Sequence, residues 1–162
     1  MRYIDLHVHS NCSDGTFSPE ELVVLGIKQE LVAFALTDHD TISGVERAIK
    51  KAEEFDNKIQ VIPGMELSCK YTISSSQSVE IHMLGYRYDI HNKKLIATLE
   101  DISNERDERN RKMCSNLQNA GFPISYDMLC ERFGDTILTR AHFARLLLEN
   151  GGVPSLDYAF RT

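Results

Sequence analysis

Residues 31–37, LVAFALT, form a nearly unbroken apolar run between two segments with helical patterns, at 18–30 and 43–55. A strand that is covered on both faces has this composition, and such strands are typical of parallel sheets with helices packed against them. The run therefore predicts an α/β fold with a largely parallel sheet.

Three further segments have the composition of strands, at 2–7, 58–67 and 78–88. Pro63 and Gly64 are expected to mark the end of the third strand. SSSQS (74–78) is expected to be a polar loop. Strands and helices thus alternate along the first ninety residues, as they do in βαβ units.

Both helical segments in this region begin with capping signals. Ser18 is a predicted N-cap, with Pro19 at the first helical position and Glu21 completing a capping box. Ser43 and Glu46 predict a second capping box at the start of the other helix.

The chain changes character at Asn92. Residues 92–121 predict a long helix that is capped by Asn92 and ends at Gly121. Shorter helical patterns follow in SYDMLCERFG, in TRAHFARLLLENGG and from residue 155. These patterns predict a division into two parts, residues 1–90 and 91–162.

Composition excludes several classes of partner. The 162 residues carry 18 basic and 24 acidic side chains, a net charge of −6, which gives no general attraction to nucleic acid or anionic membranes. We therefore expect no membrane association and no stable binding of duplex nucleic acid. Without a membrane-length apolar run or a signal-peptide pattern, and with four widely spaced cysteines expected to be reduced, the chain is expected to be cytoplasmic.

Potential metal ligands follow or lie on each predicted strand. His7 and His9 are two residues apart at the end of the first strand, so alternation points their side chains to the same side. Because active sites of parallel α/β folds gather at the carboxyl ends of strands, we expect these ligands to converge. Mixed imidazole and carboxylate ligands suit zinc, manganese or iron better than calcium. The candidate ligands are His7, His9, Asp14, His39, Glu66 and His82.

Five short motifs in this order resemble the PHP (polymerase and histidinol phosphatase) family. They are DLHVHS (5–10), SDG (13–15), LTDHDT (36–41), PGMELS (63–68) and HMLGY (82–86). The resemblance implies a distorted (β/α)7 barrel, of which residues 1–90 would supply the first four strands, followed by a helical insertion at 91–162. It also implies up to three divalent cations, with manganese favoured and zinc, iron or magnesium as alternatives.

The resemblance also assigns roles to single residues. His7, His9 and Glu66 resemble the ligands of one metal. Glu66 would bridge to a second metal, which His82 joins, and Asp14 and His39 resemble ligands of a third.

For Asp38 we expect a capping role or orientation of His39. For Asp40 that interpretation and a contact with substrate both stay open.

The helical part resembles the insertion of stand-alone PHP phosphoesterases, among them 3′,5′-nucleoside bisphosphate phosphatases and 5′→3′ exoribonucleases that act on short RNA. Arg106 and Arg109 are three residues apart and are expected to share a helix face that binds substrate, although 104–112 could equally be a solvated charged face. Arg140 and His142 open another helix, where backbone N–H groups also favour anions. Thr139 and Ala141 stand where this branch usually has Gly and Pro.

These features predict a metal-dependent phosphoesterase. Its substrate would be a small phosphorylated molecule, a phosphomonoester or phosphodiester of a nucleotide or short oligonucleotide, attacked by a metal-activated hydroxide. No catalytic residue beyond the metal ligands is expected. The alternatives are a histidinol-phosphate phosphatase and a non-catalytic metal-binding fragment.

The resemblance covers the first half of a PHP domain. The family's second half supplies three more ligands, a His in an AHP-like segment and an Asp and a His in a DFH-like segment, and neither segment occurs in this sequence. We therefore expect the chain by itself to be a weak or inactive enzyme of marginal stability, with one edge of its sheet unpaired.

Overall fold

The computed structural model of the chain describes residues 3–75 and 77–161. The chain divides into two compact units, one up to Leu99 and one from Glu100 onward. The boundary lies within helix α3 (Lys93–Asn119), later than the division expected after residue 90. Each unit has its own cluster of buried apolar side chains.

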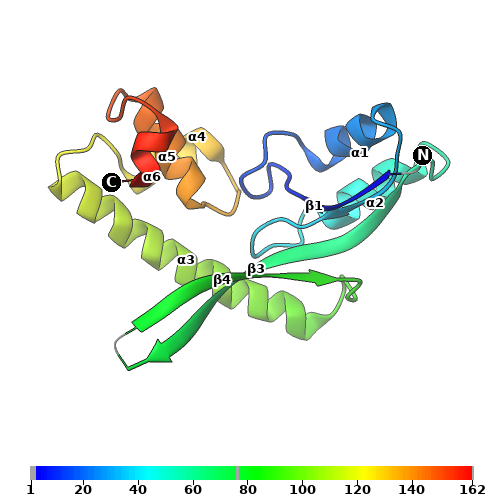
Figure 1. Cartoon of the computed structure of the whole chain (residues 1–162), viewed down its shortest axis with the longest axis horizontal. Helices are drawn as coiled ribbons and strands as arrows, with labels where there is room; N and C mark the ends of the chain where they lie inside the picture. Colours follow the sequence, from blue (N-terminus) through cyan, green and yellow to red (C-terminus); the bar gives the residue numbers. More distant parts are fainter. Residues whose placement is uncertain (1–2, 76, 162) are drawn as a thin grey trace. The chain divides into compact units, whose positions relative to one another are not determined.

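The first unit is built on a four-stranded sheet in the order β1-β2-β3-β4 (Figure 1). The strands are β1 (Tyr3–Val8), β2 (Leu31–Leu36), β3 (Gln60–Ser74) and β4 (Gln77–Tyr86). β1, β2 and β3 are parallel, whereas β4 is antiparallel to β3. The predicted α/β class is thus confirmed, and only the last strand departs from the parallel arrangement.

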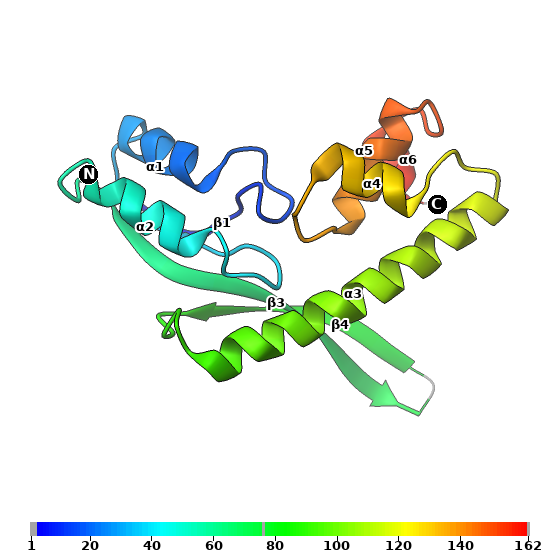
Figure 2. The ribbon, with the colours of Figure 1, turned by 180° about the vertical axis from the view of Figure 1, so that it is seen from behind.

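Helices α1 (Pro19–Lys28) and α2 (Val45–Glu53) connect the parallel strands and lie side by side (Figures 1 and 2). Both helices pack on the face of the sheet that carries Phe34 and Leu36. Ala33 and Ala35, on the opposite face of β2, are also buried, so this strand is covered on both faces as predicted. The core cluster consists of Leu22, Val23, Phe34, Leu36, Val45, Ala48, Ala52, Ile59 and Val61.

The prediction that β3 ends at Pro63 and Gly64 is wrong. Pro63 is the last residue of β3 that pairs with β2, opposite Leu36, and Gly64 is the first that pairs with β4, opposite Tyr86. The two residues therefore mark a change of neighbouring strand within one long strand. The predicted loop at 74–78 is shorter than expected, because Ser74 already pairs with Gln77; residue 76 lies outside the described residues.

The hairpin formed by β3 and β4 separates polar from apolar side chains over most of its length, with Leu84, opposite Glu66, as an apolar residue on the mainly polar face. Directly opposed residues of an antiparallel pair share one face. One face carries Leu67 opposite Met83, Cys69 opposite Ile81 and Tyr71 opposite Val79. The other face carries Ser68 opposite His82 and Lys70 opposite Glu80. Glu66, two residues before Ser68, lies on this polar face together with His82.

One of the two predicted capping boxes is present. The Ser18 hydroxyl accepts a hydrogen bond from the backbone N–H of Glu21, and the Glu21 carboxylate accepts one from the backbone N–H of Ser18. The predicted box at Ser43 is wrong, because the N-cap of α2 is Gly44, without a side-chain cap. The Ser43 hydroxyl instead accepts a hydrogen bond from Thr41 Oγ1 in the preceding turn.

This difference predicts unequal effects of two alanine substitutions. Ser18→Ala removes an N-cap and should lower the free energy of unfolding by about 1 kcal/mol. Ser43→Ala removes only a hydroxyl at an exposed turn and should cost less than about 0.5 kcal/mol. Urea denaturation followed by circular dichroism measures both values. Equal losses would show that the α1 capping box contributes nothing specific.

The second unit consists of the larger part of α3 together with α4 (Tyr126–Phe133), α5 (Arg140–Glu149) and α6 (Leu156–Arg161). The Asn92 side chain accepts hydrogen bonds from two backbone N–H groups at the start of α3, as predicted. Gly121, with φ of 88°, follows the end of that helix. The core cluster consists of Cys114, Ile124, Leu129, Leu138, Phe143, Leu146, Leu147 and Val153.

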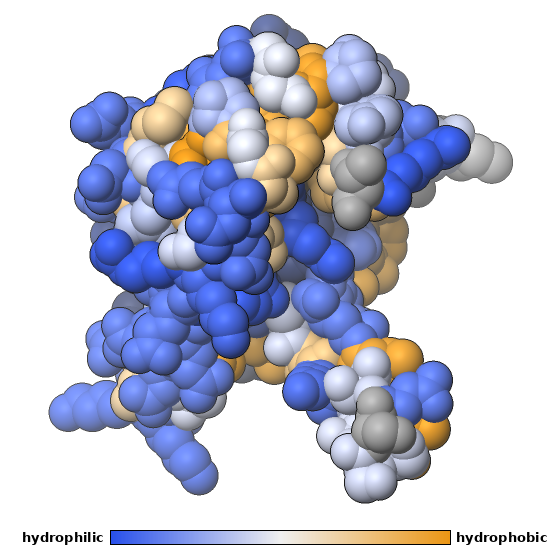
Figure 3. All heavy atoms as spheres, turned by 90° about the vertical axis from the view of Figure 1, so that its left-hand side faces the viewer, coloured by the Kyte–Doolittle hydropathy of each residue, from blue (hydrophilic) through white to orange (hydrophobic). Residues whose placement is uncertain are grey.

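Much of the molecular face seen in Figure 3 is hydrophilic, with smaller hydrophobic patches among the polar residues. Within residues 3–75 and 77–161, no helix combines the length and the apolar character needed to cross a membrane.

Candidate metal centre

Six side chains with metal-binding groups converge in the first unit. β1 and the loop after it carry the first three, the segment after β2 carries the fourth, and β3 and β4 carry one each. Their ligand atoms form three groups, and within each group all atoms lie within 4.8 Å of one another. The groups are His7, His9 and Glu66; His9, Asp14 and His39; and His39, Glu66 and His82.

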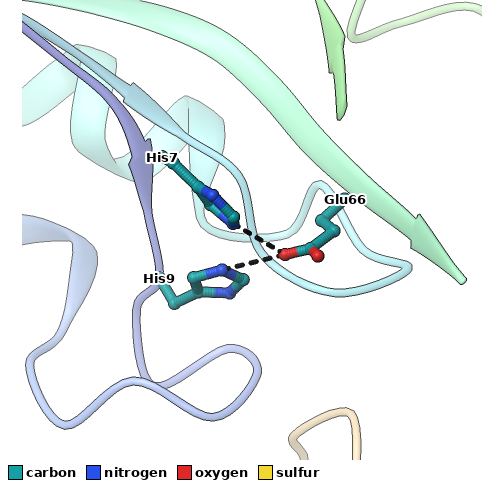
Figure 4. Close-up of side chains that lie close together, drawn as sticks. All are labelled: His7, His9 and Glu66. Carbon is teal, nitrogen blue, oxygen red and sulfur yellow. Dashed lines mark hydrogen bonds and ion pairs between the residues drawn. The ribbon is translucent and has the colours of Figure 1, made fainter. Parts of the chain in front are cut away.

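Glu66 lies at the centre of this arrangement and is only 6% exposed. Its Oε2 atom is 2.8 Å from Nε2 of His7 and 3.0 Å from Nε2 of His9 (Figure 4). Its Oε1 atom is 2.7 Å from Nδ1 of His82. One carboxylate thus contacts imidazoles from β1, from the segment after it and from β4.

A second carboxylate, that of Asp14, lies between two imidazoles. Its Oδ1 atom is 3.4 Å from Nδ1 of His9, and its Oδ2 atom is 3.5 Å from Nε2 of His39. The other ring nitrogen of His39, Nδ1, is 3.8 Å from Oε2 of Glu66. The His39 ring therefore lies between the two carboxylates.

Local geometry explains why these side chains meet. His7 and His9 point to the same side because they are two residues apart in extended backbone. A backbone bridge pairs His39 with Glu66: the N–H of Glu66 donates to Asp38 O, and the N–H of Asp40 donates to Glu66 O. The segment after β2 is thereby fixed beside β3.

The site fits divalent cations. His39 Nδ1 is buried and has no hydrogen-bond partner among the described residues, and a buried polar atom without a partner is costly unless a ligand satisfies it. His39 belongs to two of the three groups of imidazole nitrogens and carboxylate oxygens, and the remaining group shares His9 and Glu66 with them. Such ligands suit zinc, manganese and iron.

Two pKa shifts favour the metal-binding forms of Glu66 and His39. Burial acts to raise the pKa of Glu66, but hydrogen bonds from His7 and His82 and the charge of His39 outweigh it, so this pKa is lowered. Burial lowers the pKa of His39, against the opposing effect of Asp14 and Glu66. A carboxylate and a neutral imidazole are the forms that metal ligation requires.

Asp38 and Asp40 support this site from the interior. The Asp38 carboxylate accepts hydrogen bonds from the backbone N–H of Ser10 and from the hydroxyls of Ser10 and Ser13. It thus caps a backbone group, the first of the two roles expected for it. The second role is not seen as a hydrogen bond, because among the described residues His39 Nδ1 has no hydrogen-bond partner and Nε2 faces Asp14. Asp40, expected as a possible substrate contact, is 1% exposed and accepts a hydrogen bond from Ser68 N.

The expected substrate-binding residues of the helical unit differ in exposure. Arg106 is buried, and its Nη1 atom lies 3.4 Å from Leu138 O, whereas Arg109 is exposed. The two residues therefore do not share one solvent-facing surface. His142 is also buried, and its Nδ1 atom accepts a hydrogen bond from the backbone N–H of Thr139 in the capping box of α5. Arg140, the first residue of that helix, is exposed.

Sequence reasoning missed three polar residues at the metal centre. Ser10 and Ser13 bind Asp38 as described, and no spacing rule links them to a residue so distant in sequence. Glu80 was detectable, because it lies two residues before His82 on a strand. Its carboxylate is 3.3 Å from Nε2 of His82, opposite the nitrogen that faces Glu66.

Comparison with known families and proteins agrees with this geometry. The PHP domain family matches residues 5–150. A 5′-3′ exoribonuclease of Haemophilus influenzae is 36% identical over 157 residues, which cover 97% of this chain and 54% of the relative. A 3′,5′-nucleoside bisphosphate phosphatase of Chromobacterium violaceum is 32% identical over 99% of this chain and 54% of the relative.

Solved structures show the same fold. An amidohydrolase from Chromobacterium violaceum, with bound sulfate and no metal, superposes with a TM-score of 0.85 and 32% identity, over 98% of this chain and 54% of that chain. A metal-dependent phosphoesterase from Bifidobacterium adolescentis superposes with a TM-score of 0.82 and 29% identity, with the same coverage. This chain therefore spans about half the length of the relatives that it matches.

Proposed function

The chain belongs to the PHP domain family, and from this we propose that it supplies the metal-binding half of a phosphoesterase site that acts on a nucleotide or short oligonucleotide. One observation carries the proposal: six imidazole and carboxylate side chains converge, with the buried carboxylate of Glu66 at their centre. The names of the relatives, an exoribonuclease and a nucleoside bisphosphate phosphatase, support phosphate esters as the substrate class.

We assign the ligands to three groups as their atoms are arranged. Glu66 would bridge the group of His7 and His9 to the group of His39 and His82, and Asp14 would join His9 and His39 in the third. When bound, divalent cations activate water and neutralise the charge that develops on phosphate. Manganese is our first candidate, because it accepts both imidazole and carboxylate ligands, with zinc, iron and magnesium as alternatives.

The exposure of the ligands indicates where substrate enters. The His7 side chain is 48% exposed and that of His82 is 35% exposed, whereas that of Glu66 is 8% exposed. The carboxylate is thus held beneath a layer of imidazoles that solvent can reach. A phosphate group would approach from the side of His7 and His82.

Residues outside the ligand set would contribute to substrate binding either by direct contact or by holding the main chain in place. We propose that the exposed Arg109 and Arg140 bind substrate phosphate, since a guanidinium can hold two oxygens at once. The buried Arg106 and His142 would act indirectly, by holding the segment of Leu138 and Thr139 that starts α5.

Asp40 would also act indirectly. Its backbone N–H donates to Glu66 O, and its carboxylate accepts from Ser68 N, so it fixes the main chain on both sides of the Glu66 side chain.

Removal of metal is the direct test of the proposed function. If the chain hydrolyses a nucleoside 3′,5′-bisphosphate, even weakly, exhaustive dialysis against a chelator should lower that rate by about a hundredfold or more, and manganese should restore it. Short RNA and histidinol phosphate, assayed in parallel, distinguish the substrate classes. Full hydrolysis without metal would contradict the proposal, and metal binding without turnover of any substrate would identify a non-catalytic metal-binding chain.

The proposed role of Arg140 predicts an effect on substrate and not on metal. Arg140→Ala should raise KM about tenfold while the metal content stays unchanged, in line with the loss of a charge-assisted hydrogen bond. Arg140→Lys should recover only part of the loss, because an ammonium group lacks the bidentate geometry. Lys112→Ala, at an exposed position of α3, serves as the control. Loss of metal from Arg140→Ala would show that the assignment is wrong.

A further inference from the structure

Asp38 is a buried carboxylate immediately before the candidate ligand His39. It is 2% exposed, and its side chain accepts three hydrogen bonds. The backbone N–H of Ser10 and the hydroxyl of Ser13 donate to Oδ1, both at 2.7 Å, and the hydroxyl of Ser10 donates to Oδ2 at 2.6 Å. All three donors belong to the segment between β1 and α1, which also contains two of the ligands.

This segment is wound around Ser10, which is fully buried. The carbonyl oxygen of Ser10 accepts hydrogen bonds from the backbone N–H groups of Ser13, at 3.1 Å, and Gly15, at 2.9 Å. Its hydroxyl oxygen accepts one from the N–H of Cys12 at 3.1 Å. These bonds turn the chain back on itself, so that the residues on either side of the turn, His9 and Asp14, come within 3.4 Å of each other.

The main chain of Asp38 reaches a third segment. Its carbonyl oxygen accepts a hydrogen bond from the N–H of Glu66 at 3.1 Å. The side chain of Asp38 therefore holds the turn after β1, and its backbone holds β3. Ser13 connects this network to a ligand directly, because its Oγ atom lies 2.7 Å from Asp38 Oδ1 and 3.4 Å from His9 Nδ1.

We infer that Asp38 is a positioning residue for the metal group of His9, Asp14 and His39, in which it holds the turn at residues 10–13 so that Asp14 faces His39. The inference rests on the proposed metal site. The turn has no regular secondary structure to fix it, and a buried carboxylate is stable only when directed donors satisfy it. In the structure, the geometry in which the turn supplies those donors is also the one that brings Asp14 within 3.5 Å of His39.

Asp38→Asn tests this inference, with the binding of Mn²⁺ alone as the readout. The asparagine keeps the shape of the side chain but replaces one acceptor oxygen with an amide donor. We expect the affinity for Mn²⁺ to fall about 10- to 100-fold, which is typical when a residue that supports a ligand is changed. Free Mn²⁺, measured by electron paramagnetic resonance during titration of the 162-residue chain, gives the affinity without any assay of hydrolysis.

A double-mutant cycle separates positioning from general destabilisation. If Asp38 acts through Asp14, the double variant Asp14→Asn/Asp38→Asn should bind Mn²⁺ about as weakly as Asp14→Asn alone. If it acts through overall stability, the two losses should multiply. Ile59→Val, in the core cluster, is the control for stability and should bind Mn²⁺ as the unmodified chain does.

Ser13→Ala provides a milder variant, because it removes one donor and leaves both bonds from Ser10. It should weaken Mn²⁺ binding in the same direction as Asp38→Asn but by less, and it remains informative if Asp38→Asn does not fold. Unchanged Mn²⁺ affinity in Ser13→Ala and in folded Asp38→Asn would overturn this inference and leave the proposed function standing. Losses of Mn²⁺ affinity that multiply in the double variant would have the same consequence. An unmodified chain that binds no Mn²⁺ would overturn the proposed function and this inference with it.

Discussion

Glu66→Gln is expected to abolish most divalent-metal binding by this chain. Glu66 contributes a ligand atom to two of the three groups, and its two oxygens face three imidazoles at 2.7–3.0 Å. A glutamine keeps the size of the side chain but removes the negative charge and turns one acceptor into a donor. We expect the affinity for Mn²⁺ to fall more than about 100-fold, beyond the effect of changing a residue that only supports a ligand.

Metal content after dialysis, measured by elemental analysis, and isothermal titration with Mn²⁺ both report this loss. Glu46→Gln is the matched control, because Glu46 is an exposed carboxylate on α2 that forms an ion pair with Lys50. The control should retain the metal content of the unmodified chain. Retention of two or more Mn²⁺ ions by Glu66→Gln would refute the central role assigned to this carboxylate.

Gly15→Ala is expected to cost both stability and metal affinity. A Cβ atom at this position would lie 2.2 Å from the carbonyl oxygen of His9 and 2.8 Å from the carbonyl carbon of Ser10. Both contacts are with backbone, so no side-chain rotation can relieve them. The turn that places Asp14 must therefore shift, and we expect a loss of about 1–3 kcal/mol in the free energy of unfolding, as for overpacked sites, together with weaker Mn²⁺ binding.

Gly85→Ala is the control for this substitution. Its added Cβ would meet only the side chain of Met65, at the ordinary contact distance of 3.6 Å. Thermal unfolding and Mn²⁺ titration of both variants give the comparison. Equal behaviour of the two variants would mean that the turn after β1 adapts freely, and it would argue against a rigid turn at the metal centre.

The convergence of the candidate ligands was predictable because it depends on simple periodicity. His7 and His9 share a side through strand alternation. His39 and Glu66 meet because β3 continues past its last pair with β2, and the segment after β2 follows it through the bridge between these two residues. His82 lies on an antiparallel strand, yet it joins them because even-numbered residues of β3 and β4 share one face of the hairpin, and this face carries both Glu66 and His82. The structure brings the six side chains together, and their role as metal ligands stays a prediction.

Features that depend on long-range packing were not predictable from the chain. A capping pattern at Ser43 does not reveal that the turn before α2 uses this hydroxyl differently. Arg106 and Arg109 have the same chemistry in sequence, but only Arg106 faces the interior of the helical unit. The Asp38 network joins residues 25 to 28 positions apart and follows no local pattern.

The sharing of ligands among the three groups makes the site a set of linked equilibria. His9 belongs to the first and second groups, His39 to the second and third, and Glu66 to the first and third, so the groups form a closed cycle. If each group holds an ion, the occupancy of one changes the affinity of both others, and the coupling is reciprocal. A titration would then report cooperative loading of one cluster rather than three independent affinities, and no substitution at these three residues could be assigned to a single ion.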